Sequence, residues 1–74
     1  MLEGIDLRGA DYRNIWLDST EPALCQQACR SDQACMAWSY VRPGIQGPKA
    51  RCWLKNRLPP RAADACCTSG IERF

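Results

Sequence analysis

Apolar and polar residues alternate most regularly in the middle of the chain, and this alternation predicts a β-hairpin. Residues 35–42 form the strongest predicted strand, and residues 50–55 form the return strand. Residues 43–48 contain two prolines and two glycines, which cannot continue a ladder of strand hydrogen bonds, and therefore predict a loop. The alternation places Cys35, Ala37, Ser39 and Val41 on one face and Met36, Trp38, Tyr40 and Arg42 on the other, and it separates Cys52 and Leu54 from Trp53 and Lys55.

Weaker patterns at the two ends of the chain predict short outer strands. Residues 4–7 alternate in polarity, and residues 12–17 are rich in aromatic and β-branched side chains. Residues 58–61 predict an extended connector, whereas residues 62–67 are ambiguous, with a single turn as one interpretation. Residues 68–74 predict a closing strand, which we expect to pair with residues 4–7.

A helix is predicted between the outer and central strands, from about Pro22 to Ser31. Ser19 or Thr20 is expected to cap the unpaired N–H groups of its first turn. Pro22 suits that turn because its missing N–H costs nothing there. The expected inner stripe consists of Leu24, Cys25, Ala28 and Cys29, and the residues expected to face water are Gln26, Gln27 and Arg30.

Six cysteines in 74 residues indicate disulfides, because a chain this short buries only a small core. The chain has no histidine, which excludes mixed cysteine–histidine zinc sites, and the cysteine spacing fits an all-cysteine site poorly. Disulfides place the protein in a secreted, cell-surface or periplasmic setting. Residues 1–74 show neither a signal peptide nor a membrane span, and we interpret them as a single domain excised from a larger extracellular or periplasmic protein.

Helix geometry narrows the choice of disulfide pairs. Cys25 and Cys29 are four residues apart and therefore share one helix face. Cys29 is close in sequence to Cys35, at the start of the central strand. Cys25, one turn back, would then reach Cys52 on the neighbouring strand. Two disulfides between the helix and the sheet are therefore expected.

The adjacent cysteines Cys66 and Cys67 are left by this pairing. Their Cα atoms are about 3.8 Å apart along the chain, which is below the usual disulfide range. A vicinal disulfide there could act as a redox or ligand-contacting ring; the alternative is a rigid turn, or a pair that is free or scrambled. A thiol–disulfide enzyme is a further hypothesis, but no helix N-terminus or Cys-x-x-Cys supports the low thiol pKa that it needs.

Three motifs combine cysteines with aromatic residues: Cys-x3-Cys on the capped helix, Cys-x-Ala-Trp-x-Tyr at residues 35–40, and Cys-Trp-Leu-Lys at residues 52–55. Together they resemble the PAN/apple domain family, and the opening Gly-Ile-Asp-x-x-Gly-x-Asp-Tyr and the closing Cys-Cys-x-Ser-Gly-Ile are similar to its bacterial members. The resemblance implies an α+β fold, with an antiparallel sheet curled around one helix and the two staples described above. It also implies a non-catalytic module without a cofactor, which binds carbohydrate or protein beside other domains of a parent protein.

The net charge of +2 hides a basic middle segment, since residues 33–63 contain no acid. A segment of one sign can attract an anionic glycan or a phospholipid headgroup, although a solvated surface is an equal alternative. Nucleic acid is not expected as a partner, because the cysteines indicate an extracellular setting. The basic residues are Arg42, Lys49, Arg51, Lys55, Arg57 and Arg61, and all but the last are ligand-binding candidates together with Trp53.

Aromatic residues offer a second candidate binding surface. The predicted hairpin places Trp38, Tyr40 and Trp53 on one face, where they could stack on a sugar ring. The alternative, which we favour, is a second small core covered by the terminal strands. Trp16 stands outside this group and is a weaker binding candidate.

No catalytic constellation is present in the sequence, which lacks histidine, Gly-x-Ser-x-Gly and a phosphate-binding loop. Asp6 and Asp11 fall well short of the ligand number that calcium prefers and are interpreted as solvated turn residues, so no metal site is expected. A small disulfide-rich protease inhibitor, presenting residues 43–51 as its loop, is the alternative to a binding module.

Overall fold

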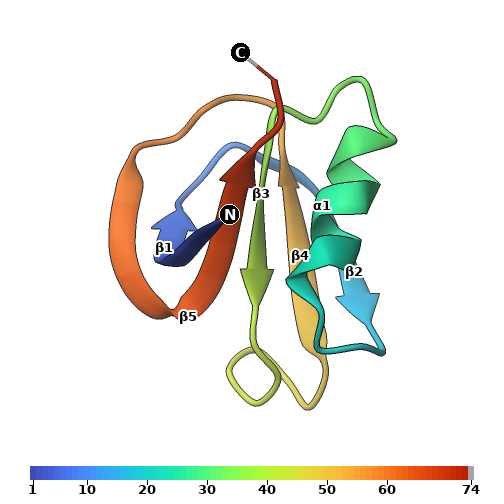
Figure 1. The fold of residues 1–74 in the computed structure, drawn as a ribbon, viewed down its shortest axis with the longest axis vertical. Coiled ribbons are helices and arrows are strands. Elements are labelled where there is room, and N and C mark those ends of the chain that lie inside the picture. The colour runs from blue at the N-terminus through green and yellow to red at the C-terminus, as the bar shows by residue number, and fades with distance from the viewer. Residues whose placement is uncertain (74) are drawn as a thin grey trace.

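The computed structural model describes residues 1–73, and Phe74, the last residue of the predicted closing strand, lies outside them. The described residues form one helix and a five-stranded antiparallel sheet, whose strands lie in the order β1-β5-β3-β4-β2. The helix α1 packs against β3 and β4 (Figure 1). The predicted α+β fold is confirmed, with β1 (Leu2–Leu7), β2 (Asp11–Leu17), α1 (Pro22–Arg30), β3 (Ala37–Val41), β4 (Ala50–Lys55) and β5 (Arg61–Ile71).

The central hairpin of β3 and β4 forms as predicted, and its register decides which side chains reach the core. Trp38 and Tyr40 lie opposite Leu54 and Cys52, respectively, and all four are buried beneath α1. The predicted grouping of Cys35 with the other face of the strand is wrong. Cys35 lies in a turn before β3 and joins the same core as Trp38, because the strand alternation begins only after that turn.

The helix α1 has the predicted bounds to within one residue but not the predicted cap. Glu21 occupies the N-cap position, and within the described residues no side chain bonds to the free N–H groups of the first turn. The expected capping by Ser19 or Thr20 is therefore wrong. Pro22 does occupy the first turn, where its fixed φ favours helix initiation.

Two disulfides tie α1 to the rest of the domain. Cys25 is bonded to Cys52 of β4, and Cys29 is bonded to Cys35 in the turn before β3. All four cysteines are fully buried. The predicted pairing is confirmed, and it fixes α1 over one face of the sheet.

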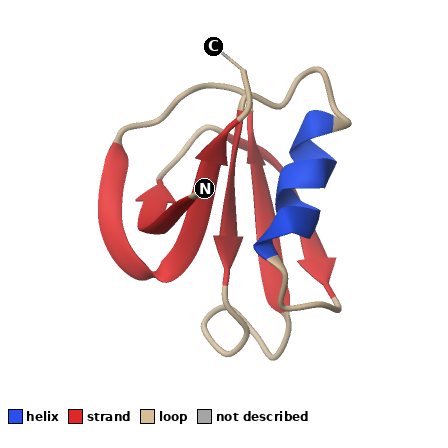
Figure 2. Cartoon of the chain, in the orientation of Figure 1, coloured by secondary structure: helices blue, strands red, loops and turns tan. Residues whose placement is uncertain are grey.

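The terminal strands β1 and β5 pair, but not through the predicted segments, because residues 5–7 pair with residues 61–63 and residues 2–3 pair with residues 68–69. Strand β5 is longer than expected and strongly bent. Leu2 lies opposite Ser69, and the register then shifts so that Gly4 alone opposes residues 64–67. Figure 2 shows β5 curving at this bulge, so that its first half leaves β3 and follows β1. The single turn considered for residues 62–67 is wrong, because these residues belong to the bent strand.

The face of the sheet opposite α1 is left without a helix. Residues 1–73 contain no helix that is long and apolar enough to cross a membrane. The end of β1 and the bend of β5 line one side of a pocket on this uncovered face, and this pocket is the candidate site.

Candidate functional site

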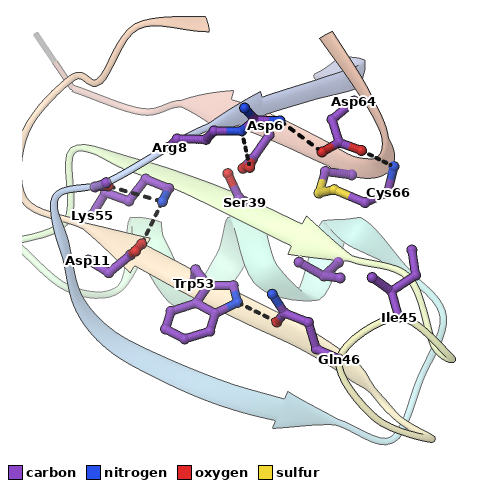
Figure 3. Close-up of a pocket in the computed structure, with 13 residues that line it drawn as sticks. Asp6, Arg8, Asp11, Ser39, Ile45, Gln46, Trp53, Lys55, Asp64 and Cys66 are labelled. Carbon is purple, nitrogen blue, oxygen red and sulfur yellow. Dashed lines mark hydrogen bonds and ion pairs between the residues drawn. A yellow bond between two sulfur atoms is a disulfide. The ribbon is translucent and has the colours of Figure 1, made fainter. Parts of the chain in front are cut away.

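A pocket of about 380 Å³ opens on the face of the sheet opposite α1 (Figure 3). Its floor is formed by Ser39 and Val41 of β3 and by Trp53 and Lys55 of β4. These residues alternate with the core residues of the same strands, so one alternation builds the core on one face and the pocket floor on the other. The end of β1 and the bend of β5 form one wall, and the loop at residues 42–49 forms another.

Arg8 lies between two carboxylates in the wall formed by β1 and β5. Its Nη2 is 3.1 Å from Oδ2 of Asp64, and its Nε is 3.4 Å from Oδ2 of Asp6. The other oxygen of Asp64 accepts a hydrogen bond from the backbone N–H of Cys66 at 3.0 Å. That hydrogen bond, followed by the hydrogen bond from Arg8, holds the pKa of Asp64 below its usual value. Asp64 is therefore an ionised, oriented acceptor at neutral pH.

Lys55 is the most buried charged residue lining the pocket, with 2% of its surface exposed. Its Nζ donates to Oδ1 of Asp11 at 2.5 Å and to the carbonyl oxygen of Gly9 at 3.1 Å. The turn after β1 and the first residue of β2 therefore supply the two partners. The ammonium group is neutralised inside the protein, which makes Lys55 an anchor of this turn and a weak candidate for attracting an anion.

Trp53 forms the aromatic side of the pocket and is held by two neighbours. Its Nε1 donates to Oε1 of Gln46 at 2.8 Å, which ties the indole to the 42–49 loop. The guanidinium carbon of Arg51 lies 4.6 Å from the centroid of the Trp53 ring. Arg51 is not part of the pocket lining, so the pocket meets the portion of the indole that Arg51 leaves open. The indole is therefore presented in one fixed orientation.

Cys66 and Cys67 form the corner of the pocket at the bend of β5. Their sulfur atoms are bonded to each other, and Cys66 is half-buried whereas Cys67 is buried. Asp6 lies close to both sulfur atoms, as in a metal-binding cluster. Sulfur atoms that are joined in a disulfide are not thiolate ligands, so this group does not fit a metal ion. Together with Val41 and Ile45, the disulfide gives the pocket an apolar side.

Ser39 and Ser69 hold β1 over the sheet beside the pocket. The hydroxyl of Ser69 donates to the carbonyl oxygen of Ile5 at 2.7 Å. The two serine hydroxyls are 2.8 Å apart, so Ser39 supplies the proton between them, and it accepts from the N–H of Leu7 at 3.3 Å. Ser39 therefore has a structural role, although it lies in the pocket floor.

The six basic residues of the middle segment do not gather into one patch. Arg42, Lys49 and Arg51 lie at the loop end of the β3–β4 hairpin. Lys55 and Arg57 lie at its other end, and Arg61 begins β5. Lys49 is paired with Asp18 at 2.7 Å. The pocket itself contains three carboxylates against one arginine and one lysine. In chain order the six residues are Arg42, Lys49, Arg51, Lys55, Arg57 and Arg61.

The predicted aromatic face is wrong in its composition. Trp38 and Tyr40 are 0% and 3% exposed and belong to the core beneath α1. Trp53 lies opposite Ser39 in the register and points to the other face of the sheet. Trp16, the weaker candidate, lies on the same face as Trp53 and is 47% exposed.

Most of the pocket residues carry no signal in the sequence that points to a site. The sequence predicts Asp6 and Asp11 to be solvated turn residues, but each is paired with a cation. Arg8, Gln46 and Asp64 were not candidates at all. Arg8 and Asp64 meet only because β5 bends back along β1, and no local pattern encodes that contact. The Asp-x-Cys spacing of residues 64–66 was the one available signal, since an Asp side chain often bonds to the N–H two residues on.

The model of the PAN domain family matches residues 5–55, which include α1, the central hairpin and both disulfides between them. No curated protein and no solved structure matches the chain. Members of this family are binding modules for protein or carbohydrate and are generally non-catalytic. Because the match covers most of the chain and the two predicted disulfides of the helix are present, the chain belongs to the PAN domain family.

Proposed function

We propose that this PAN domain is a non-catalytic extracellular module that binds carbohydrate in the pocket on the uncovered face of the sheet. The observation that carries the proposal is the pairing of a fixed indole, Trp53, with oriented charged hydrogen-bonding groups in one pocket. The pocket volume of about 380 Å³ lies within the range of small-molecule sites.

A sugar ring has two kinds of surface, and the pocket offers a partner for each. The C–H face of a pyranose packs against an aromatic ring, which Trp53 supplies beside the disulfide and Ile45. The hydroxyl groups need donors and acceptors. Asp64 and Asp6 supply acceptors and Arg8 supplies donors, and their mutual contacts hold these groups in place before a ligand arrives.

The charges favour a neutral sugar over the anionic glycan that the basic segment suggested. Both cations that line the pocket are already paired with carboxylates, and carboxylates outnumber cations three to two. An anionic ligand would meet this excess of negative charge at close range. Binding is therefore expected to be insensitive to salt.

The same geometry argues against Asp64 as the general acid of a hydrolytic site. A general acid needs a raised pKa, whereas the hydrogen bonds from Cys66 and Arg8 lower that of Asp64. Two fully buried disulfides suit an oxidising environment, which supports a secreted, cell-surface or periplasmic setting.

An array of neutral and anionic glycans, probed with the oxidised domain at low and high salt, tests the proposal. We expect binding to neutral sugars at both salt concentrations. Trp53→Ala and Asp64→Ala should each weaken it about tenfold. Arg57→Ala is the matched control, since Arg57 is exposed and lies outside the pocket. Binding that disappears at high salt, or that survives both pocket substitutions, would refute this assignment.

The protease-inhibitor alternative stays a prediction. The proposed inhibitor loop folds back on itself, with the N–H of Gly44 bonded to the carbonyl oxygen of Gly47 at 2.7 Å. Gln46 points into the pocket side and bonds to Trp53. A segment that adds to a protease cleft needs an extended backbone, so this loop would have to open first.

A further inference from the structure

A row of half-buried and exposed side chains continues from the pocket across the uncovered face of the sheet to its edge. Trp53 and Arg51 of β4 are two residues apart, and Trp16 of the edge strand β2 lies opposite Arg51. The guanidinium carbon of Arg51 is 4.6 Å from the ring centroid of Trp53 and 4.2 Å from that of Trp16. The arginine therefore links the two indoles into one layer.

Contacts at both ends hold this row in a single arrangement. Arg51 donates from Nε and Nη2 to Oδ1 of Asn14 at 3.1 and 2.8 Å, which fixes the plane of its guanidinium group. Gly47 approaches Trp16 so closely that a Cβ at this position would lie 3.1 Å from the ring. The Trp16 ring is therefore positioned by the 42–49 loop and by Arg51 together.

Trp16 remains 47% exposed although it is held on two sides. An exposed cation–π contact contributes only weakly to stability, so a smaller side chain at this position on the edge strand would cost the fold little. An ordered, half-exposed indole that adjoins a ligand pocket has the character of a stacking surface. The row is continuous with the pocket because Trp53 belongs to both.

We propose that the ligand is a neutral oligosaccharide, with one sugar unit in the pocket and a later unit of the same chain stacked on Trp16. This inference rests on the proposed carbohydrate-binding function. The bend of β5 walls the pocket on one side, so a chain leaves it on the other side, over Trp53 and Arg51 toward β2. The N–H groups of Arg51 that do not bond to Asn14 face hydroxyl groups of the intervening part of the chain.

The test is the dependence of affinity on chain length. Calorimetric titration uses oligomers of one to four units of glucose, mannose, galactose and N-acetylglucosamine. In the series that binds, we expect affinity to rise about tenfold between the single sugar and the longer oligomers. Trp16→Ala should abolish that rise and leave the affinity for the single sugar unchanged, whereas Trp53→Ala should weaken both.

Leu58→Ala is the matched control, because Leu58 is an exposed apolar residue at a site away from the row. If Trp16→Ala does not fold, an NMR titration of the unaltered protein replaces this variant. The indole N–H resonance of Trp16 should then shift with the longer oligomers but not with the single sugar. Affinity that is independent of length, or a length effect that survives the loss of Trp16, overturns the extended site alone. Failure of every series to bind overturns the carbohydrate function and the extended site together.

Discussion

At the scale of single residues, Trp38 has the most demanding surroundings in the core. It is fully buried beneath α1, and its Nε1 donates to Oε2 of Glu72 at 3.0 Å. Gln26 and Arg30, which the sequence placed in water, donate to the same carboxylate. Burial alone would raise the pKa of Glu72, but these hydrogen bonds outweigh it and lower the pKa below the usual value. A buried indole and a buried carboxylate thus satisfy each other.

Gly70 makes this arrangement possible, because it lies opposite Trp38 in the sheet. A Cβ at residue 70 would lie 2.6 Å from ring atoms of Trp38. We expect Gly70→Ala to lower the free energy of unfolding by about 1–3 kcal/mol through overpacking, as measured by urea denaturation. Ala65→Ser, on the exposed side of the same strand, should change it by less than about 0.5 kcal/mol. Equal midpoints for the two variants would contradict this account.

At the scale of elements, the edge strand β2 contacts the turn after α1 at Asp32, which also lies 4.0 Å from Nη1 of Arg13. The hydroxyl of Tyr12 donates to Oδ2 of Asp32 at 2.8 Å. Burial, followed by this hydrogen bond and the charge of Asp32, raises the pKa of Tyr12 from 10.0 to about 12. The hydrogen bond from Tyr12, followed by one from the N–H of Ala34, lowers the pKa of Asp32. The ionised carboxylate of Asp32 therefore favours protonated Tyr12, and the hydroxyl of Tyr12 favours ionised Asp32.

The ultraviolet absorbance of tyrosinate checks this contact. In the folded state the pKa of Tyr12 exceeds that of an unfolded tyrosine, so the contact stabilises the protein fully below about pH 10. That stability should be lost as the pH rises toward 12. Asp32→Asn should move the titration of Tyr12 closer to 10, whereas Asp18→Asn should not. Tyr12→Phe assigns the signal, and an ordinary titration of Tyr12 in the unaltered protein would rule the contact out.

The elements also show what the sequence could and could not predict. Local patterns predicted α1, the β3–β4 hairpin and the helix-to-sheet disulfides, because the signals lie within about 30 residues of one another. The predicted alternation holds for residues 37–41, but Cys35 was assigned to the wrong face because it lies in the turn before β3, where the alternation does not apply. The predicted aromatic face was wrong because the register pairs Trp53 with Ser39, and side chains of cross-strand partners share a face. Residues 62–67 were not recognised as a strand because their partner, β1, lies at the other end of the chain. The pocket depends on that distant pairing, so it could not be predicted either.

At the scale of the whole molecule, the three disulfides found among residues 1–73 fall into two environments. The two that hold α1 have all four cysteines fully buried. The third lies at the pocket corner, where Cys66 is half-buried. A reductant can therefore reach the third disulfide in the folded protein, whereas it reaches the other two only after unfolding.

Graded reduction followed by alkylation and mass spectrometry tests this difference. Mild reduction should label Cys66 and Cys67 first, and the core cysteines only under denaturing conditions. Replacing Cys25 and Cys52 with alanine should lower the free energy of unfolding by about 3.6 kcal/mol, since that disulfide spans 27 residues of sequence. Serine at both Cys66 and Cys67 should cost much less. Labelling of Cys66 and Cys67 without any reductant would contradict the vicinal disulfide. Simultaneous labelling of all six cysteines would contradict the difference in accessibility between the third disulfide and the other two.

The pairing of Leu2 with Ser69 has a mechanical consequence. A force that pulls the two ends of the domain apart loads the β1–β5 hydrogen bonds one after another, starting at the open end, so the pair unzips at low force. The peeling stops at the part of the chain that the Cys25–Cys52 disulfide encloses, because no further length can be released there without breaking a covalent bond. Under tension the domain extends until the Cys25–Cys52 disulfide bears the applied force. The pocket, which is walled by β1 and β5, opens in the first step of that extension.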